Sequence, residues 1–146
     1  MNSRDRLLAA LDQDIQQDLV SYRQLLALSQ SLHVQLLQRD AQAVEDTNHA
    51  IAVLVEQASA RAQRRSRILS AFSLKAEEQG MNILFASCGR EVRDGLEAGW
   101  AQLGRLVDAC RQQNDYNAQL LAMQHSILDH LLGQTAQADI YAPQYY

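Results

Sequence analysis

The feature that most constrains this chain is a seven-residue repeat of apolar side chains that runs through long stretches without proline. The only proline of the 146 residues is Pro143, close to the C-terminal end. Leu8, Ile15, Tyr22 and Leu36 stand at multiples of seven from one another. Side chains spaced in this way share one face of an α-helix, and a sustained repeat is typical of helices packed in a bundle.

The repeats predict three long helices, over residues 4–38, 41–79 and 90–132. Asp40 is suited to cap the second helix after a tight turn. Gly80 and Gly133 are expected to end the second and third helices, because glycine readily takes the left-handed conformation that follows a helix. The connector between these helices is short and apolar, and we expect one turn of helix through Asn82–Ala86.

We therefore expect an all-α fold: an elongated antiparallel bundle of three long helices with a short helical connector and a flexible C-terminal tail. The bundle should form one domain over residues 1–132, followed by the tail over 133–146. At least about 75% of the chain should be helical, far above the usual third. A rise of 1.5 Å per residue makes each helix roughly 50–65 Å long, so the expected shape is a rod.

Two amides interrupt the apolar stripe of the third predicted helix. Asn114 and Asn117 stand three residues apart, which places them on one helical face. The other members of this stripe are Leu96, Trp100, Leu103, Val107, Cys110, Leu121, Leu128 and Leu131. A buried amide without a partner costs about 1–3 kcal/mol. The pair is therefore either an internal polar layer of the bundle or a surface that pairs with a partner molecule.

The only basic cluster contains Arg61, Arg65 and two further arginines. In a hairpin that turns near Asp40, paired residue numbers sum to about 80. Arg61 should then face Asp18 or Leu19, and Arg65 should face Asp14 or Ile15. We favour this pairing over nucleic-acid binding, since the net charge of −4 gives no global basic field.

The sequence contains no recognisable catalytic, cofactor-binding or metal-binding motif. No Glu-x-x-His occurs, and His125 and His130 stand five residues apart, a spacing that places them on different faces of a helix. We expect no enzymatic activity and no cofactor. No apolar run approaches the ~18 residues that would span a membrane, so we expect no membrane insertion. Cys88 and Cys110 form no C-x-x-C motif and are expected to be reduced thiols in the cytoplasm.

Several of these features occur together in one known family. A long helical hairpin precedes a single tryptophan, Trp100, and an N-x-x-N-x-x-L-L run follows it, before a tail that contains Tyr141. The run comprises Asn114, Asn117, Leu120 and Leu121, with Leu106 upstream. Over essentially its whole length the chain resembles the FlgN family of flagellar type III export chaperones.

The resemblance implies a cytoplasmic, non-enzymatic chaperone that binds a terminal amphipathic helical segment of the hook–filament junction proteins FlgK and FlgL. It also implies delivery of these clients to the export-gate protein FlhA. The expected client-binding residues are Asn114, Asn117, Leu120, Leu121, Ile127, Leu128 and Leu131. The expected docking residues for the export gate are Tyr141, Tyr145 and Tyr146.

One alternative function stays open. The same apolar repeats would suit a structural or adaptor coiled coil that self-assembles and has no secretion client. A chaperone should be a monomer or weak dimer when free, whereas a structural coiled coil should be a stable oligomer.

Overall fold

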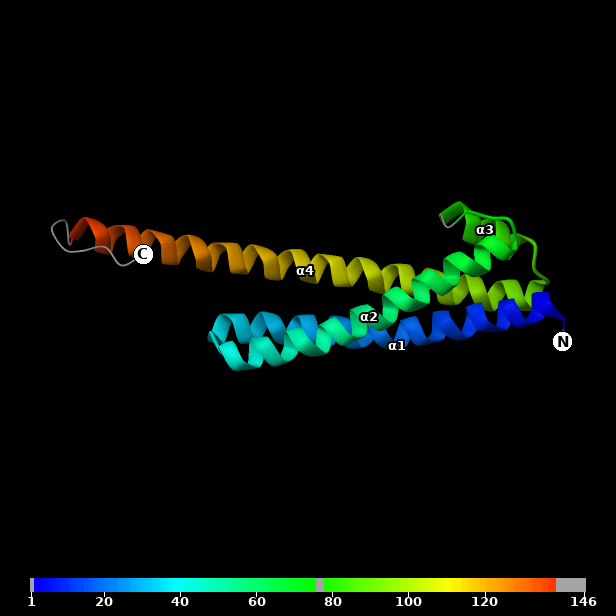
Figure 1. The fold of residues 1–146 in the computed structure, drawn as a ribbon, viewed down its shortest axis with the longest axis horizontal. Helices are drawn as coiled ribbons and strands as arrows, with labels where there is room; N and C mark the ends of the chain where they lie inside the picture. Colours follow the sequence, from blue (N-terminus) through cyan, green and yellow to red (C-terminus); the bar gives the residue numbers. More distant parts are fainter. Residues whose placement is uncertain (1, 76–77, 139–146) are drawn as a thin grey trace.

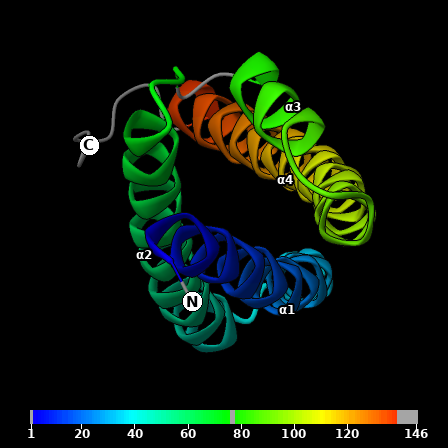
Figure 2. The same ribbon diagram turned by 90° about the vertical axis from the view of Figure 1, so that its right-hand side faces the viewer.

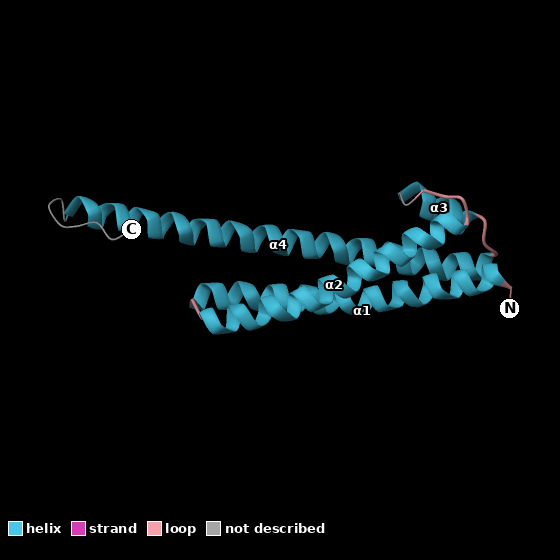
Figure 3. Ribbon diagram, in the orientation of Figure 1, coloured by secondary structure: helices cyan, strands magenta, loops and turns pink. Residues whose placement is uncertain are grey.

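The computed structural model describes residues 2–75 and 78–138, and the side chains of the last helix up to residue 133. The described residues form four helices: α1 (Ser3–Gln38), α2 (Ala41–Ala71), α3 (Glu78–Ala86) and α4 (Arg90–Ala138). Helix accounts for 92% of the described residues, and no strand occurs among them (Figure 3). The expected all-α class is confirmed, and the molecule is elongated (Figure 1).

α1 and α2 form the hairpin that the sequence predicts. Arg39 adopts a left-handed conformation with φ 55°, and its N–H donates to the carbonyl oxygen of Leu36. The N–H of Asp40 donates to the carbonyl oxygen of Gln35, which completes the end of α1. The Asp40 side chain then accepts a bond of 3.1 Å from the Ala43 N–H, as expected of a helix cap.

α2 ends eight residues before the boundary predicted at residue 79, so that prediction is wrong. Ser73 takes the left-handed conformation with φ 59°, and the N–H of Leu74 donates to the carbonyl oxygen of Leu69. Gly80 does not end α2 but lies within α3. A Cβ atom at Gly80 would stand 2.1 Å from the Lys75 carbonyl oxygen, so this glycine permits a close backbone approach.

α3 is the predicted helical connector, although it begins at Glu78 rather than at Asn82. It places Met81, Leu84 and Phe85 almost fully inside the core. This burial explains why the chain turns early after α2, because a continuous helix to residue 79 could not return these side chains to the bundle. The core that they join also contains Leu8, Leu11, Ile15, Leu19, Ile68, Leu69, Leu96 and Leu103.

α4 packs along α1, and the two helices run in the same direction. Hydrogen bonds link α1 residues to α4 residues 88 positions later, as between Leu36 and Gln124, and this constant offset requires a parallel register. Gly99 of α4 is buried, and a Cβ there would stand 3.0 Å from Ile15 Cγ2, so the glycine lets the two helices approach closely.

The arrangement therefore differs from a closed antiparallel bundle. α1 lies between α2 and α4, and within the described residues α2 and α4 have no close backbone approach (Figure 2). α1 and α2 run antiparallel, as expected of two helices joined by a short turn, and the third long helix, α4, is parallel to α1, as an up-down-up order requires. The difference from a compact three-helix bundle is that α4 packs along α1 without a close backbone approach to α2 within the described residues.

α4 also continues past its predicted end at residue 132. Gly133 lies within the helix, which extends to Ala138. A Cβ at Gly133 would meet nothing within 4 Å, so this glycine neither caps the helix nor permits a close approach. A single glycine costs only about 1 kcal/mol in a helix, too little to end one by itself. The tail was predicted over 133–146; residues 133–138 are helical, and 139–146 lie outside the described residues.

None of the helices in the described part of the chain combines the length and hydropathy needed to cross a membrane.

Candidate functional site

Asn117 of α4 is buried against α1, with 6% of its surface exposed. Its Nδ2 donates to the Ser29 carbonyl oxygen at 2.8 Å. Its Oδ1 accepts from Gln113 Nε2 at 3.0 Å and lies 3.0 Å from His33 Nδ1. The His33 ring stacks on Tyr116 with a centroid distance of 4.2 Å. Asn117 is thus paired inside the bundle, where its bonds fix the register of α4 against α1.

Asn114 lies differently, so the two amides do not share one environment: Asn117 belongs to an internal polar layer, whereas Asn114 is exposed. The buried and half-buried residues of α4 that follow the contact with α1 include Leu103, Leu106, Cys110, Gln113, Asn117, Leu120 and Gln124. Asn114 and Leu121 belong to the neighbouring edge of the helix and are exposed. α1 therefore covers one edge of a wide apolar stripe and leaves the other edge open.

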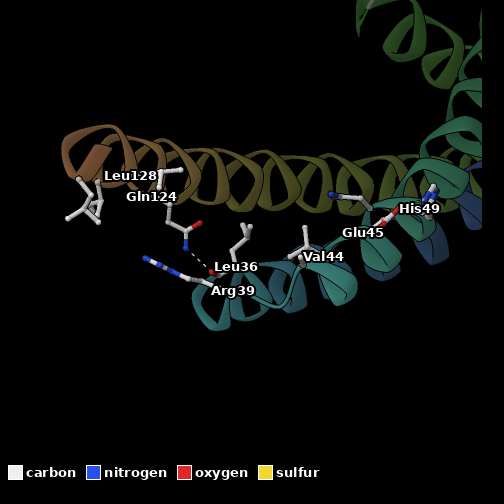
Figure 4. A pocket seen from close by; sticks show the side chains of 11 residues that line it. Leu36, Arg39, Val44, Glu45, His49, Gln124 and Leu128 are labelled. Atoms are coloured by element: carbon white, nitrogen blue, oxygen red, sulfur yellow. Dashed lines mark hydrogen bonds and ion pairs between the residues drawn. The ribbon is translucent and has the colours of Figure 1, made fainter. Parts of the chain in front are cut away.

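A cleft opens where the tip of the hairpin faces the C-terminal half of α4, and we call it the distal cleft (Figure 4). Its volume is about 650 Å³. Its apolar lining residues come from three helices: Leu36 of α1, Ala41 and Val44 of α2, and Ile127, Leu128 and Leu131 of α4. Its polar lining residues are Arg39, Glu45, Asn48, His49 and Gln124. Gln124 Nε2 donates to the Leu36 carbonyl oxygen at 2.7 Å and joins α4 to α1 here.

The structure brings three of the seven predicted client-binding residues together in this cleft, namely Ile127, Leu128 and Leu131. About half of the Leu128 surface is exposed, at 52%. Leu120 is half-buried against α1. The predicted site therefore divides into an exposed apolar part and a buried part, and only the exposed part can contact another molecule without rearrangement.

The sequence analysis missed the contribution of the hairpin tip to this cleft. Leu36 closes the heptad series of α1, and Val44 opens the apolar series of α2. Their position at the two ends of the turn was the available signal, because a short turn necessarily brings such residues together. The sequence did not give the direction in which α4 runs along α1, which is what places Leu128 opposite Leu36 and Val44.

The other half of the molecule holds a buried ionic network. The Arg61 Nε donates to Asp18 Oδ1 as predicted, and Arg61 also donates to Ser21 at 2.7 Å. Arg65 pairs with Asp18 at 3.1 Å rather than with Asp14, which corrects that part of the prediction.

Arg64 takes the place predicted for Arg65 and binds both carboxylate oxygens of Asp14, at 2.6 and 2.8 Å. The hydrogen bond to Asp14, followed by the charge of that carboxylate, raises the pKa of Arg64. Three of the four clustered arginines, Arg61, Arg64 and Arg65, are therefore engaged within the hairpin. Arg65 also lies 5.1 Å from the ring centre of Trp100. A network of this kind fixes the alignment of two helices more than it adds stability.

Two titratable side chains at the α1–α4 contact are shifted by their surroundings. Burial, followed by the charge of Asp18, raises the pKa of Tyr22. Burial raises the pKa of the Cys110 thiol, whose Sγ lies 3.5 Å from the Tyr22 carbonyl oxygen. Among the described residues, no group of three or more His, Cys, Asp and Glu side chains could hold a metal ion.

The model of the family described as FlgN protein matches residues 1–137. No curated protein and no solved structure matches the chain. Since the family match covers most of the sequence, the chain belongs to the FlgN family of flagellar export chaperones.

Proposed function

We propose that this protein is a cytoplasmic chaperone for the hook–filament junction proteins FlgK and FlgL. It binds a terminal amphipathic helical segment of each client and delivers the complex to the export-gate protein FlhA. Membership of the FlgN family supports the chaperone role. The observation that carries the proposal is the apolar distal cleft beside the exposed edge of α4.

The chemistry of the cleft suits an amphipathic helix. Leu36, Val44 and Leu128 offer an apolar surface that is open to solvent, and a client helix would bury it. Binding also covers the apolar face of the client, which would otherwise favour aggregation before export. The mechanism is sequestration followed by transfer, and no bond is made or broken.

Each predicted client-binding residue has a role that fits its position. Asn114, Leu121, Ile127, Leu128 and Leu131 contact the client directly. Asn117 and Leu120 act as positioning residues, because they hold α4 in register on α1. Tyr141, with Tyr145 and Tyr146, is the proposed contact with FlhA. In this scheme client and receptor use different parts of the chain, so the loaded chaperone can still dock.

The client surface is tested by Leu128→Arg, measured by calorimetric titration with FlgK and with FlgL from the same bacterium. We expect at least a tenfold loss of affinity, because a charge is placed in an apolar contact. The matched control is Val20→Arg, an equally exposed side chain (52%) on α1 outside the cleft, which should bind both clients normally. Equal binding by the two variants contradicts the proposed surface.

The delivery step is tested by deleting residues 139–146. We expect normal client binding and reduced secretion of FlgK and FlgL from living cells, and Tyr141→Ala should reproduce most of the defect. Full secretion by the truncated chain would show that the tail has no docking role.

A further inference from the structure

A second hollow, which we call the proximal hollow, lies between α2 and α4 nearer to α3. Its volume is about 590 Å³, and it is lined by Tyr22 of α1, by Ala62 and Leu69 of α2, and by Trp100 and Val107 of α4, among others. α1, α2 and α4 also line the distal cleft, and Met81 of α3 is a further lining residue of the proximal hollow. Both hollows lie between α2 and α4, which have no close backbone approach to each other in the described residues, although the Arg65 guanidinium of α2 lies over the Trp100 ring of α4.

Heptad spacing along α4 connects the two hollows. Trp100 and Val107 line the proximal hollow, and Leu128 lines the distal cleft. Asn114 and Leu121 fall between them at intervals of seven, and both are exposed. Residues seven apart keep nearly the same direction on a helix, within about 20°. One continuous line of α4 therefore faces the open side of the bundle.

α2 presents a matching line on the opposite wall. Ala41 and Asn48 line the distal cleft, and Ala62 and Leu69 line the proximal hollow. Val55 falls between them at the same interval of seven, and 52% of its surface is exposed.

α1 supplies the floor in the same register. Tyr22 belongs to the proximal hollow and Leu36 to the distal cleft, while Ser29 lies midway and is half-buried. The two hollows are therefore aligned along one line between α2 and α4, with α1 beneath it, and we call this line the trough. From Trp100 to Leu128 the trough is about 42 Å long, the length of a helix of roughly 28 residues.

The outer rims of this trough are acidic. Asp108, Asp115 and Asp129 follow one another on α4 at multiples of seven, and all three are exposed. On α2, Glu45 lines the distal cleft, and Glu56 follows it eleven residues, or three helical turns, later; both are exposed. The basic side chains at the trough are fewer: Arg39 at its mouth, Arg65 bound to Asp18 within it, and Arg111 beside Asp108.

We propose that the trough between α2 and α4 seats one amphipathic helix of the client, which completes a four-helix bundle. The apolar stripe of that helix faces Val55, Leu121 and Leu128, and lysine or arginine residues flank the stripe and face the acidic rims. This inference rests on the proposed function and adds that α2 is half of the binding surface. It also states the charge pattern of the client segment.

Charge decides between a client helix and a second copy of this chain. A second copy would bring its own acidic rims against Asp115, Asp129 and Glu45, and like charges in close contact are unfavourable. A separate helix with basic flanks meets no such repulsion.

The experiment compares two valines of α2 that stand two residues apart. Val55→Arg places a charge on the trough wall, whereas Val53→Arg places the same charge on the opposite side of the helix. Val53 is the matched control because 55% of its surface is exposed, nearly the same as for Val55. Binding of FlgK and FlgL from the same bacterium is measured by titration calorimetry, and circular dichroism confirms that both variants fold. We expect at least a tenfold loss of affinity for Val55→Arg and less than a twofold change for Val53→Arg.

Leu121→Arg on the opposite wall separates this inference from the proposed function. If Leu121→Arg abolishes binding while Val55→Arg binds as Val53→Arg does, the client lies on α4 alone. That result overturns the trough and leaves the chaperone role intact. If neither client binds the unaltered protein, the proposed function fails and the inference falls with it. A dimer of this chain that Val55→Arg dissociates would also overturn it, since a second copy then fills the trough.

The charge pattern has its own test. Glu45→Gln combined with Glu56→Gln should weaken client binding about three- to tenfold at low salt, with little difference left at 0.5 M salt because surface charges are then screened. Asp12→Asn combined with Glu91→Gln removes the same charge from exposed positions outside the trough and should leave the affinity unchanged. Equal binding by both double variants would contradict the basic flanks.

Discussion

The two ends of this molecule differ in how completely they are packed. At the proximal end, the start of α1, the end of α2, α3 and the start of α4 enclose a core around Leu11, Ile15 and Phe85. At the distal end, the hairpin tip and α4 leave Val44, Leu121 and Leu128 beside an open cleft. The difference teaches that one end can supply the folding energy while the other keeps apolar surface for a partner.

The largest contrast between the ends should appear when large apolar side chains are removed. Phe85→Ala should destabilise the protein by about 3–5 kcal/mol, because it leaves a cavity in a closed core. Leu128→Ala should cost less than about 1 kcal/mol, because its side chain is half exposed. Denaturant unfolding measures both, and similar losses would mean that the distal end is packed like the proximal one.

The buried ionic network should show the next largest effect. Asp18→Asn leaves Arg61 and Arg65 without a matching charge in a buried site, and we expect a loss of about 3 kcal/mol in unfolding free energy. Asp14→Asn should cost less, since half of the Arg64 side chain is exposed and can turn to water. An equal loss for the two variants would contradict the difference in burial.

The two asparagines sharpen the comparison within α4. Asn117→Ala removes three hydrogen-bond contacts and should destabilise the protein by about 1–3 kcal/mol. Asn114→Ala should stay within about 0.5 kcal/mol, because the residue is exposed. For client affinity we expect a direct loss with Asn114→Ala even though stability is retained. Thermal unfolding and titration calorimetry on the same samples separate the two roles.

The smallest expected effect concerns the thiol of Cys110. Because burial raises its pKa in the folded protein, the folded state holds the thiol proton more tightly than the unfolded chain does. The resulting stability is present below the pKa of the unfolded thiol and is lost as pH rises through the raised, folded value. The Cys88→Ser variant leaves Cys110 as the single thiol. The pH at which its alkylation rate rises should be higher in the folded protein than in the protein unfolded by denaturant. Coinciding pH profiles would contradict the shift.

Local signals predicted the hairpin well. The Asp40 cap follows from a residue at the turn itself. The pairing of Arg61 with Asp18 follows from the position of the turn, because facing residues of the hairpin have numbers that sum to about 80. The roles of Gly80 and Gly133 could not be predicted from the sequence, because a glycine can end a helix, permit a close backbone approach or do neither. Lys75 lies against Gly80, and open space surrounds Gly133. Only the three-dimensional surroundings distinguish these cases.

The candidate site was predicted in part for a similar reason. The wide stripe of α4 was visible in the sequence, but the edge that α1 covers depends on how the helix is rotated. That rotation buries Asn117 and exposes Asn114 and Leu121. The contribution of α2, through Val44, required knowing on which side of α1 the helix α4 returns.

The central claim is that the distal end is an incomplete bundle that a client helix completes. Amide hydrogen exchange, followed on the free protein and on its complex with FlgK from the same bacterium, tests this claim most directly. We expect residues 44–55 and 114–132 to exchange faster than the proximal core when free, and at least tenfold more slowly once FlgK is bound. Slow exchange of these segments already in the free protein, or protection by FlgK only around α3 and the start of α1, would contradict it.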